Sequence, residues 1–162
     1  MSAEAATIAS PQMSKSDMEK ALKKQIGPVN EDVKAIIELG ACRRMALALD
    51  NHDPIHFDHE AASRRGYKGI VAPWPLLWLF FFNCSEYHLD LPFGRATVHG
   101  QDDYRFHVPM IVGDEITTST DVIEATLKEG RSGLLGHVVA RRRFINQNGE
   151  LCAELITTLI RR

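Results

Sequence analysis

The feature that most constrains this fold is an apolar run, Pro75-Leu76-Leu77-Trp78-Leu79-Phe80-Phe81-Phe82, whose helical pattern continues to about His88. A helix that is apolar on every side has to be covered by protein on nearly every side. The run is far shorter than the ~20 residues that a membrane span needs, and Pro73 and Pro75 stand at its start. We therefore predict a buried central helix rather than a membrane span.

The second half of the chain supplies candidate cover for that helix. Four segments are rich in Val, Ile, Thr and Phe, as strands are: Thr97–Phe106, Glu115–Leu127, Gly136–Asn146 and Glu150–Arg161. The turns between them are marked by Gly113-Asp114, Glu129-Gly130 and Asn148-Gly149. Helices followed by a run of antiparallel strands indicate an α+β domain. One long apolar helix wrapped by an antiparallel sheet is the hot-dog arrangement.

Three shorter helices are expected ahead of the central helix. Ser16-Asp17-Met18-Glu19 has the spacing of a capping box and Gly27-Pro28 is a stop signal, which predicts a helix over 17–26. Asn30 can cap a second helix, and its apolar stripe would be Ile37, Ala41, Met45 and Ala48. Asp58 can cap a third, brief helix that Gly66 closes. We expect residues 1–27 to form a tail with a short helix and residues 28–162 to form one domain.

Charge and cysteine content argue against several classes of protein. The net charge of -2 gives no general attraction to nucleic acid or to acidic membranes. Cys42, Cys84 and Cys152 are odd in number and form no Cys-x-x-Cys pair. A disulfide framework is therefore not expected, and a reducing cytoplasm fits best. The N-terminus has no basic stretch followed by an apolar one, which argues against a secretory signal.

A polar loop, Asn51-His52-Asp53-Pro54-Ile55-His56-Phe57-Asp58, places amide, carboxylate and imidazole groups ahead of the apolar run. An imidazole can take up or release a proton near neutral pH, and a carboxylate beside it helps. His56 is therefore the leading candidate for a catalytic base; the alternative is a histidine that only hydrogen-bonds within the loop. Asp53 is a weaker candidate as its partner, because aspartate before proline is also common in turns.

The loop and a second stretch together resemble the MaoC-like (R)-specific enoyl hydratases and dehydratases. The first stretch is ALALDNHDPIHFDHEAASRRGYKGIVAP and the second is VHGQDDYRFHVPMIVGDEI. The similarity runs from about residue 28 to the C-terminus, and it looks closest to the branch described as the N-terminal half of MaoC dehydratases. The resemblance implies a hot-dog fold, dimeric or pseudo-dimeric, that handles 2-enoyl or 3-hydroxyacyl thioesters of coenzyme A or acyl carrier protein in fatty acid metabolism.

The resemblance also carries site residues onto this chain. Active members have Asp-x-Asn-Pro-Leu-His, whose Asp and His activate water, and then a His-Gly whose glycine N–H holds the thioester oxygen. His56 and Pro54 match that histidine and proline, whereas Asn51 stands at the catalytic Asp and Asp53 at the Asn. Ala72-Pro73 stands at the His-Gly. Asparagine can orient a water but cannot act as a base, and proline has no N–H to donate.

Other groups would have to complete such a site. Asp50 lies one position from the family's Asp, and either Asp50 or Asp53 can supply the missing carboxylate if the loop brings it to His56. The oxyanion donor would be another backbone N–H, such as that of Trp74 at the positive end of the central helix. The alternative is that a partner subunit supplies the donor.

Arginines and histidines elsewhere have competing interpretations. Arg141 and Arg143 share one face of a strand and can meet the phosphates of coenzyme A, although a solvated sheet face is the commoner reason for such a pattern. His52, His56 and His59 lack the spacing and the partner ligands of a zinc site, so no metal is expected. No cofactor is expected either, because the chain has no phosphate-binding glycine loop and no Rossmann pattern.

Two functions from different classes remain open. In the first, the chain is itself a hydratase or dehydratase, with His56 as base, Asp50 or Asp53 orienting it and Asn51 holding the water. In the second, it is the non-catalytic subunit of a heteromeric dehydratase and shapes the acyl tunnel for a partner that carries the complete Asp, His and Gly set. The resemblance implies that N-terminal-type halves often work in the second way. A thioesterase on the same fold is a weaker third hypothesis, because a fold does not fix a reaction.

Overall fold

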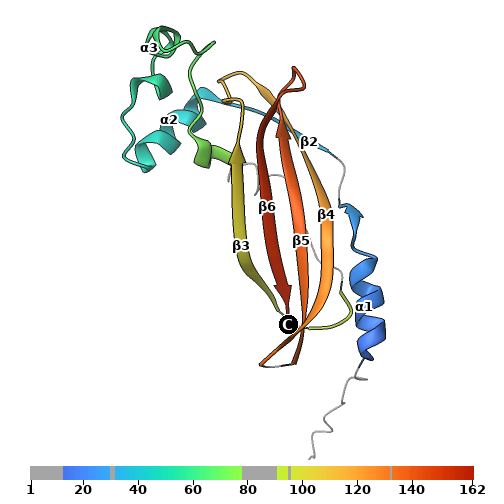
Figure 1. Cartoon of the computed structure of the whole chain (residues 1–162). Coiled ribbons are helices and arrows are strands. Elements are labelled where there is room, and N and C mark those ends of the chain that lie inside the picture. Colours follow the sequence, from blue (N-terminus) through green and yellow to red (C-terminus); the bar gives the residue numbers. More distant parts are fainter. Residues whose placement is uncertain (1–12, 30–31, 78–90, 95, 132) are drawn as a thin grey trace, which may run out of the picture.

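One antiparallel sheet dominates the computed structural model (Figure 1), which describes residues 13–29, 32–77, 91–94, 96–131 and 133–162. Among these residues the sheet has six strands in the order β1-β4-β5-β6-β3, with β2 also paired to β4. The strands are β1 Gly27–Pro28, β2 Val33–Ile36, β3 Thr97–Phe106, β4 Glu115–Gly130, β5 Gly133–Ile145 and β6 Leu151–Arg161. The helical elements are α1 Lys15–Lys23, α2 Leu39–Ala48, α3 His59–Arg64 and two 3-10 turns, η1 Pro54–His56 and η2 Trp74–Leu76.

The four long strands lie close to their predicted bounds, and β3 matches its prediction at both ends. β4 and β5 pair further than predicted, as far as Gly130 opposite Gly133, so the hairpin turn falls after the predicted Glu129-Gly130. Gly133 has a φ of +112°, which a residue with a Cβ atom rarely adopts, so the tight reversal favours glycine there. The turn at Asn148-Gly149 is confirmed, with the Gly149 N–H donating to the Asn146 carbonyl at 3.0 Å.

The long strands bury one face of the sheet, here called the inner face. Along β4 every second residue is buried up to Val122, and a bulge at Ile123 then shifts burial to Ala125. Along β5 every second residue from Gly136 to Phe144 is buried. Successive side chains of a strand point to opposite faces, so this alternation fixes which residues face inward. Burial of a side chain the size of Phe144 stabilises the fold by roughly 1.5–3 kcal/mol.

The prediction of a second helix in residues 30–38 is wrong where the structure describes that segment; Asn30 itself lies outside the described residues. Residues 33–36 form β2, which pairs antiparallel with the start of β4 so that Val33 lies opposite Thr118. Helix α2 begins only at Leu39. β-Branched Val33 favours extended backbone, and pairing with β4 gives the peptide groups of β2 their partners. Ile37, expected on the helical stripe, is buried in the core ahead of the helix.

Two short helices show how far a cap can be predicted. Helix α1 begins earlier than expected because Ser14, not Ser16, caps it: Ser14 Oγ accepts from the Asp17 N–H at 3.2 Å, and its hydroxyl donates to Asp17 Oδ2 at 2.7 Å. The cap of α3 is confirmed, because Asp58 Oδ1 accepts a backbone N–H of the first turn at 2.7 Å. Gly66 ends α3 with a φ of +85°. Each cap satisfies an N–H group that the helix leaves unpaired.

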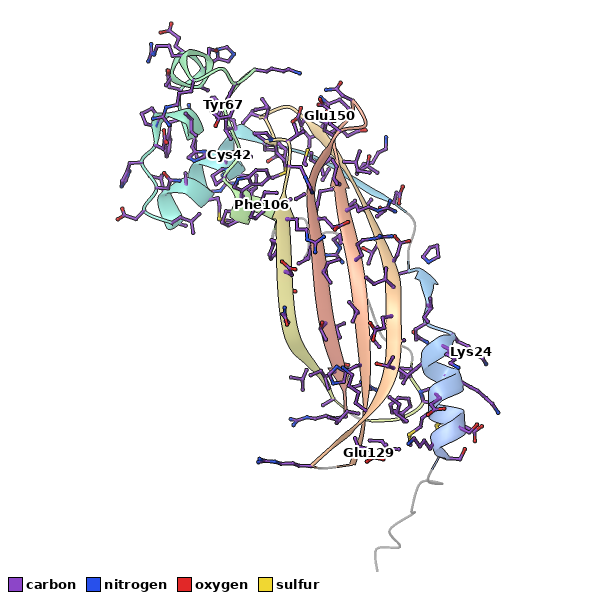
Figure 2. All side chains as sticks on the ribbon, in the orientation of Figure 1. Lys24, Cys42, Tyr67, Phe106, Glu129 and Glu150 are labelled. Carbon is purple, nitrogen blue, oxygen red and sulfur yellow. The ribbon has the colours of Figure 1, made fainter. Side chains whose placement is uncertain are left out.

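Among the described residues, two apolar clusters line the inner face, one toward each end of the sheet. The loop-end cluster joins α2 and η2 to the sheet and contains Ile37, Cys42, Ala72, Leu76, Leu77, Met110, Ile116, Phe144, Cys152, Ala153 and Leu155. The α1-end cluster contains Leu22, Leu91, Phe93, Val122, Ala125 and Val138. Figure 2 shows Cys42 and Phe106 toward one end of the sheet and Glu129 at the other.

The predicted central helix falls mainly on residues 78–90, which lie outside the described residues. Its expected start is described, and there the chain forms η2 and reaches Leu77. Both Leu76 and Leu77 are fully buried against the sheet. No helix in the described part of the chain is long and apolar enough to cross a membrane.

Candidate active site

The polar loop begins where α2 ends on a left-handed residue. Asp50 has a φ of +53°; its N–H donates to the Leu47 carbonyl at 3.1 Å, and the Asn51 N–H donates to the Ala46 carbonyl at 2.9 Å. These two bonds form the Schellman arrangement that ends many helices. The arrangement turns the chain out of α2 and leaves the Asp50 carboxylate 96% exposed, where it accepts from His52 Nε2 at 2.9 Å.

Asn51 and Asp53 hold the backbone of the loop in shape. Asn51 Oδ1 accepts from the Asp53 N–H at 3.0 Å, and Asp53 Oδ1 accepts from the Ile55 N–H at 3.2 Å, which caps η1. The other carboxylate oxygen of Asp53 pairs with Arg65 at 2.6 Å. The Arg65 guanidinium, and then the Ile55 N–H, lower the pKa of Asp53. Asp53 is therefore a carboxylate held by Arg65, and both Asn51 and Asp53 have structural partners.

His56 is the buried polar side chain of the loop, with 7% of its surface exposed. Its Nδ1 lies 2.7 Å from the Val71 carbonyl oxygen. Because a carbonyl oxygen only accepts, Nδ1 must carry the proton, and in the neutral ring Nε2 keeps its lone pair. The orienting group of His56 is thus a backbone carbonyl rather than any of the candidate carboxylates.

The segment that holds His56 is tied to the second stretch of the predicted motif. The Val71 N–H donates to the Ile55 carbonyl at 3.0 Å. Together with the bond from His56 Nδ1 to the Val71 carbonyl, this gives Val71 two hydrogen bonds to η1. The Ala72 N–H donates to the Met110 carbonyl at 2.8 Å, and Val71 forms a bridge with Ile111. The two stretches singled out in the sequence are therefore neighbours in space, with His56 packed behind them.

Trp74 follows directly and opens η2. Among the described residues its backbone N–H donates no hydrogen bond, because the first N–H groups of a helical turn have no partner within it. Its indole ring packs against Phe106 at the end of β3, with ring centroids 4.4 Å apart. Phe106 in turn stacks on Tyr104 at 5.8 Å, and burial, followed by the charge of Asp102, raises the pKa of Tyr104 to about 12. The rings of Trp74, Phe106 and Tyr104 thus form a row of packed aromatic side chains along β3.

The structure brings together some of the predicted site residues and separates others. Asn51, Asp53 and His56 share one loop, but Asp50 turns away toward His52. Arg141 and Arg143 lie on the outer face of β5, where both guanidinium groups contact Asp121 Oδ2, at 3.5 Å and 3.2 Å. They are therefore on the opposite side of the sheet from the cluster that supports the loop. In the described part of the chain no group of three or more histidine, cysteine or acidic residues is arranged to hold a metal.

Two arginines that the sequence argument did not select have clearer roles. Arg65 pairs with Asp53, as described above. Arg142 is 6% exposed on the inner face, and its Nε donates to Thr120 Oγ1 at 3.0 Å. The signal was available in the alternation of β5, since Arg142 is two residues from the large apolar Phe144 and shares its face. The sequence holds no comparable pattern for Arg65, because its pairing with Asp53 depends on the path that the loop takes between them.

Comparison with known proteins adds three findings to this geometry. The family model described as the FAS1-like, dehydratase domain region matches residues 24–155. A UPF0336 protein of Mycobacterium tuberculosis (strain ATCC 25618 / H37Rv) is 31% identical over 128 residues, which is 74% of this chain and 72% of that protein. The C-terminally truncated HadBC complex of M. tuberculosis, a 3R-hydroxyacyl-ACP dehydratase, has a chain of 26% identity and a TM-score of 0.65, covering 83% of this chain and 96% of that one.

A further solved structure bears on the fold alone. The (R)-hydratase from A. caviae involved in PHA biosynthesis is 19% identical, with a TM-score of 0.60 over 79% of this chain and 90% of that one. These likenesses and the antiparallel sheet with few helices confirm the predicted hot-dog fold and the predicted resemblance to MaoC-like proteins.

Proposed function

Because the chain belongs to the FAS1-like dehydratase domain family, we propose that it is a subunit of a hydro-lyase that acts on 2-enoyl or 3-hydroxyacyl thioesters of coenzyme A or acyl carrier protein. The observation that carries the proposal is the setting of His56. It is a buried imidazole with a fixed tautomer, bonded to the Val71 carbonyl on the segment that leads to Trp74, and none of the candidate carboxylates hydrogen-bonds to it.

The chemistry defines what such a site must supply. Hydration moves a proton from water to a base, joins the resulting hydroxide to C3 and delivers a proton to C2, while negative charge builds on the thioester oxygen. Dehydration is the reverse. His56 Nε2 can take the proton from water, and the Trp74 N–H can donate to the thioester oxygen. The charge of Asp53 acts on His56 and contributes, after Arg65 and the Ile55 N–H, to the lowered pKa of Asp53, but the described loop provides no carboxylate that hydrogen-bonds to the imidazole.

The geometry supports best a subunit that works beside a second hot-dog chain. Asn51 stands where the family has its catalytic aspartate, and its side-chain oxygen is engaged by the Asp53 N–H. The Asp53 carboxylate is engaged by Arg65 and the Ile55 N–H. In such an assembly the partner holds the complete catalytic pair, and this chain shapes the acyl tunnel.

Strand β3 is the natural edge for that partner. Within the described residues β3 pairs only with β6 and leaves its other edge open. Val98 and Phe106 on β3 are large apolar side chains that remain exposed, Phe106 at 47%. An open edge strand with exposed apolar side chains is a ready template for pairing with another chain. The HadBC neighbour is itself a two-component dehydratase complex.

A second candidate is that this chain catalyses the reaction alone. The protonated Nδ1 of His56 leaves Nε2 as a base, which favours this candidate. Here Asn51 would orient the water, and Asp50 or Asp53 would have to leave its present partner to reach the imidazole.

Loss of enoyl absorbance with trans-2-enoyl thioesters of coenzyme A and acyl carrier protein tests both candidates. The assay is run on the purified chain, on His56→Ala and on His59→Ala, a matched control on exposed α3. Turnover by the chain alone that disappears only in His56→Ala identifies an enzyme and its base. Turnover that needs a hot-dog partner and survives His56→Ala identifies the subunit role. Absence of both turnover and thioester binding, with and without partner, would overturn the proposal.

A further inference from the structure

We propose that, without a different hot-dog protein present, the open edge of β3 binds a second copy of this chain, with the two strands antiparallel and Tyr104 of each on the two-fold axis. Strand β3 is the outermost strand on its side of the described sheet (Figure 1). The pairing specifies which residues of the two copies face one another, and it does not depend on the reaction that the site performs.

The backbone of β3 presents alternate residues to its open edge. At the end of the strand, the His107 N–H donates to the Cys152 carbonyl at 2.9 Å and therefore points to β6. Peptide groups alternate in direction along a strand, so those of Asp102 and Phe106 point the other way, to the open edge. The register shift along β3 lies before Gln101. The segment from Asp102 to Phe106 is therefore regular and has about the usual length of a strand.

Two exposed charges of opposite sign stand two residues apart on the outer face of this segment. Asp103 has no ion-pair partner among the described residues. Arg105 has one long contact, 3.7 Å from Nη1 to Glu154 Oε1, and 63% of its side chain is exposed. Opposite charges that face each other across two strands attract, and like charges repel. The edge therefore offers an acid and a base with which another strand can pair.

One antiparallel register of two β3 strands satisfies both charges. Hydrogen-bonded pairs have to join residues that face the open edge, so the axis has to pass through one of residues 102–106. An axis at Asp103 or at Arg105 sets two like charges opposite each other. An axis at Tyr104 sets Asp103 of each copy opposite Arg105 of the other, at the positions where cross-strand side chains are closest. An axis at 102 sets Asp103 opposite Gln101, and one at 106 sets it beyond the partner strand.

Charged residues on an edge strand often prevent it from pairing. Such protection requires that a second copy meets repulsion in each register. The acid and base of β3 instead attract in one register and repel in the two neighbouring ones. The charges therefore select a register rather than block the edge.

The same register brings the candidate sites of the two copies together. On the inner face, Asp102 of one copy would lie opposite Phe106 of the other, whose ring packs on Trp74 with centroids 4.4 Å apart. Asp102 Oδ1 accepts from Thr157 Oγ1 at 2.8 Å and lies 3.1 Å from His99 Nε2. Each copy would thus place a fixed carboxylate beside the aromatic row of the other copy.

Self-association of the full chain, measured by sedimentation equilibrium, tests the charge pairs. Asp103→Arg and Arg105→Asp each turn two attractive pairs into two repulsive ones and should raise the dimer dissociation constant by about tenfold or more. An equimolar mixture of the two variants should recover the wild-type value, because each pair in the mixed dimer again joins an acid to a base. Loss of folding cannot produce that recovery. Lys128→Glu, an exposed charge reversal on β4, is the matched control and should change nothing.

Cysteine cross-linking tests the register independently. Tyr104→Cys places the two thiols at the axis, where Cα atoms about 5.5 Å apart suit a disulfide. Gln101→Cys places them roughly 20 Å apart, so under oxidising conditions it should give no more covalent dimer than the wild type. A wild type that stays monomeric at about 0.1 mM, a dimer that Asp103→Arg does not weaken, or cross-linking through Gln101→Cys would each overturn the proposal. None of these outcomes bears on the enoyl assay, which tests the proposed function separately.

Discussion

Polar and charged side chains gather in two regions of this molecule, the loop from Asp50 to Asp58 and the middle of β5, and they are fixed in different ways. In the loop, the bonds join near neighbours: Asn51 reaches the Asp53 N–H, and Asp53 reaches the Ile55 N–H. On β5, Arg142 reaches Thr120, which is 22 residues away in the chain. The loop is shaped locally, whereas the roles of the β5 arginines depend on how β4 and β5 are paired.

The largest expected effect on the free energy of unfolding comes from replacing Arg142, the buried one of three consecutive arginines on β5. Arg142→Ala removes a buried side chain and leaves the Thr120 hydroxyl without its donor, so we expect a loss of about 2–4 kcal/mol in the free energy of unfolding. Arg141→Ala, one position away on the outer face, should cost less than about 1 kcal/mol, because Arg143 still contacts Asp121 and the pair is partly solvated. Urea denaturation of the two variants measures both values.

Equal losses in the two variants would contradict the assignment of the faces. Arg142→Met is the informative companion, since it keeps an apolar stem of similar length and removes the charge. If packing of the stem accounts for most of the effect, Arg142→Met should recover a large part of the stability that Arg142→Ala loses.

This difference also explains what the sequence could and could not predict. The strands from Thr97 onward and the cap at Asp58 follow from short-range patterns and appear as expected. Strand β2 was predicted as helix, because residues 33–36 form a strand only when β4 offers an edge. Arg141 and Arg143 were selected as a same-face pair, which is right, but their partner Asp121 lies on β4 and could not be known until the sheet was assembled.

The candidate site shows the same difference between features set by nearby residues and features set by distant ones. His56 was predictable as a candidate from its motif, whereas its burial and its partner were not. The Val71 carbonyl is 15 residues away, and a backbone group leaves no signature in the sequence. The pairing of Asp53 with Arg65 was equally hidden, and it removes the carboxylate that the sequence offered first.

Replacing Asp50, where the loop leaves α2, should change the free energy of unfolding by a smaller amount. A left-handed φ of +53° is easier for glycine than for aspartate. Asp50→Gly should therefore raise the free energy of unfolding by up to about 1 kcal/mol, and Asp50→Ala should lower it by a similar amount. If Asp50 only ends the helix, activity of the assembled enzyme should be the same in wild type and Asp50→Gly. A loss of activity in the stabilised variant would instead return Asp50 to the catalytic candidates, which thermal unfolding and the enoyl assay together decide.

The smallest effect near neutral pH, and the one that tests the loop most specifically, concerns the charge of Asp53. Its pKa is lowered in the folded protein, chiefly by the Arg65 side chain. A carboxyl group with a lowered pKa stabilises the fold above its unfolded pKa of about 3.9, and this stabilisation is lost as pH falls through the lower folded value. Asp53→Asn keeps the side-chain oxygen that caps η1 and removes only the charge.

The difference in unfolding free energy between wild type and Asp53→Asn should therefore be constant above about pH 5 and shrink below about pH 4. Asp17 and Glu150 also have lowered pKa values and give both proteins a common acid dependence, so the difference isolates Asp53. A difference that does not change with pH would mean that Arg65 does not hold the carboxylate in solution. Asp53 would then be free to turn toward His56, and the case for a catalytic loop in this chain alone would strengthen accordingly.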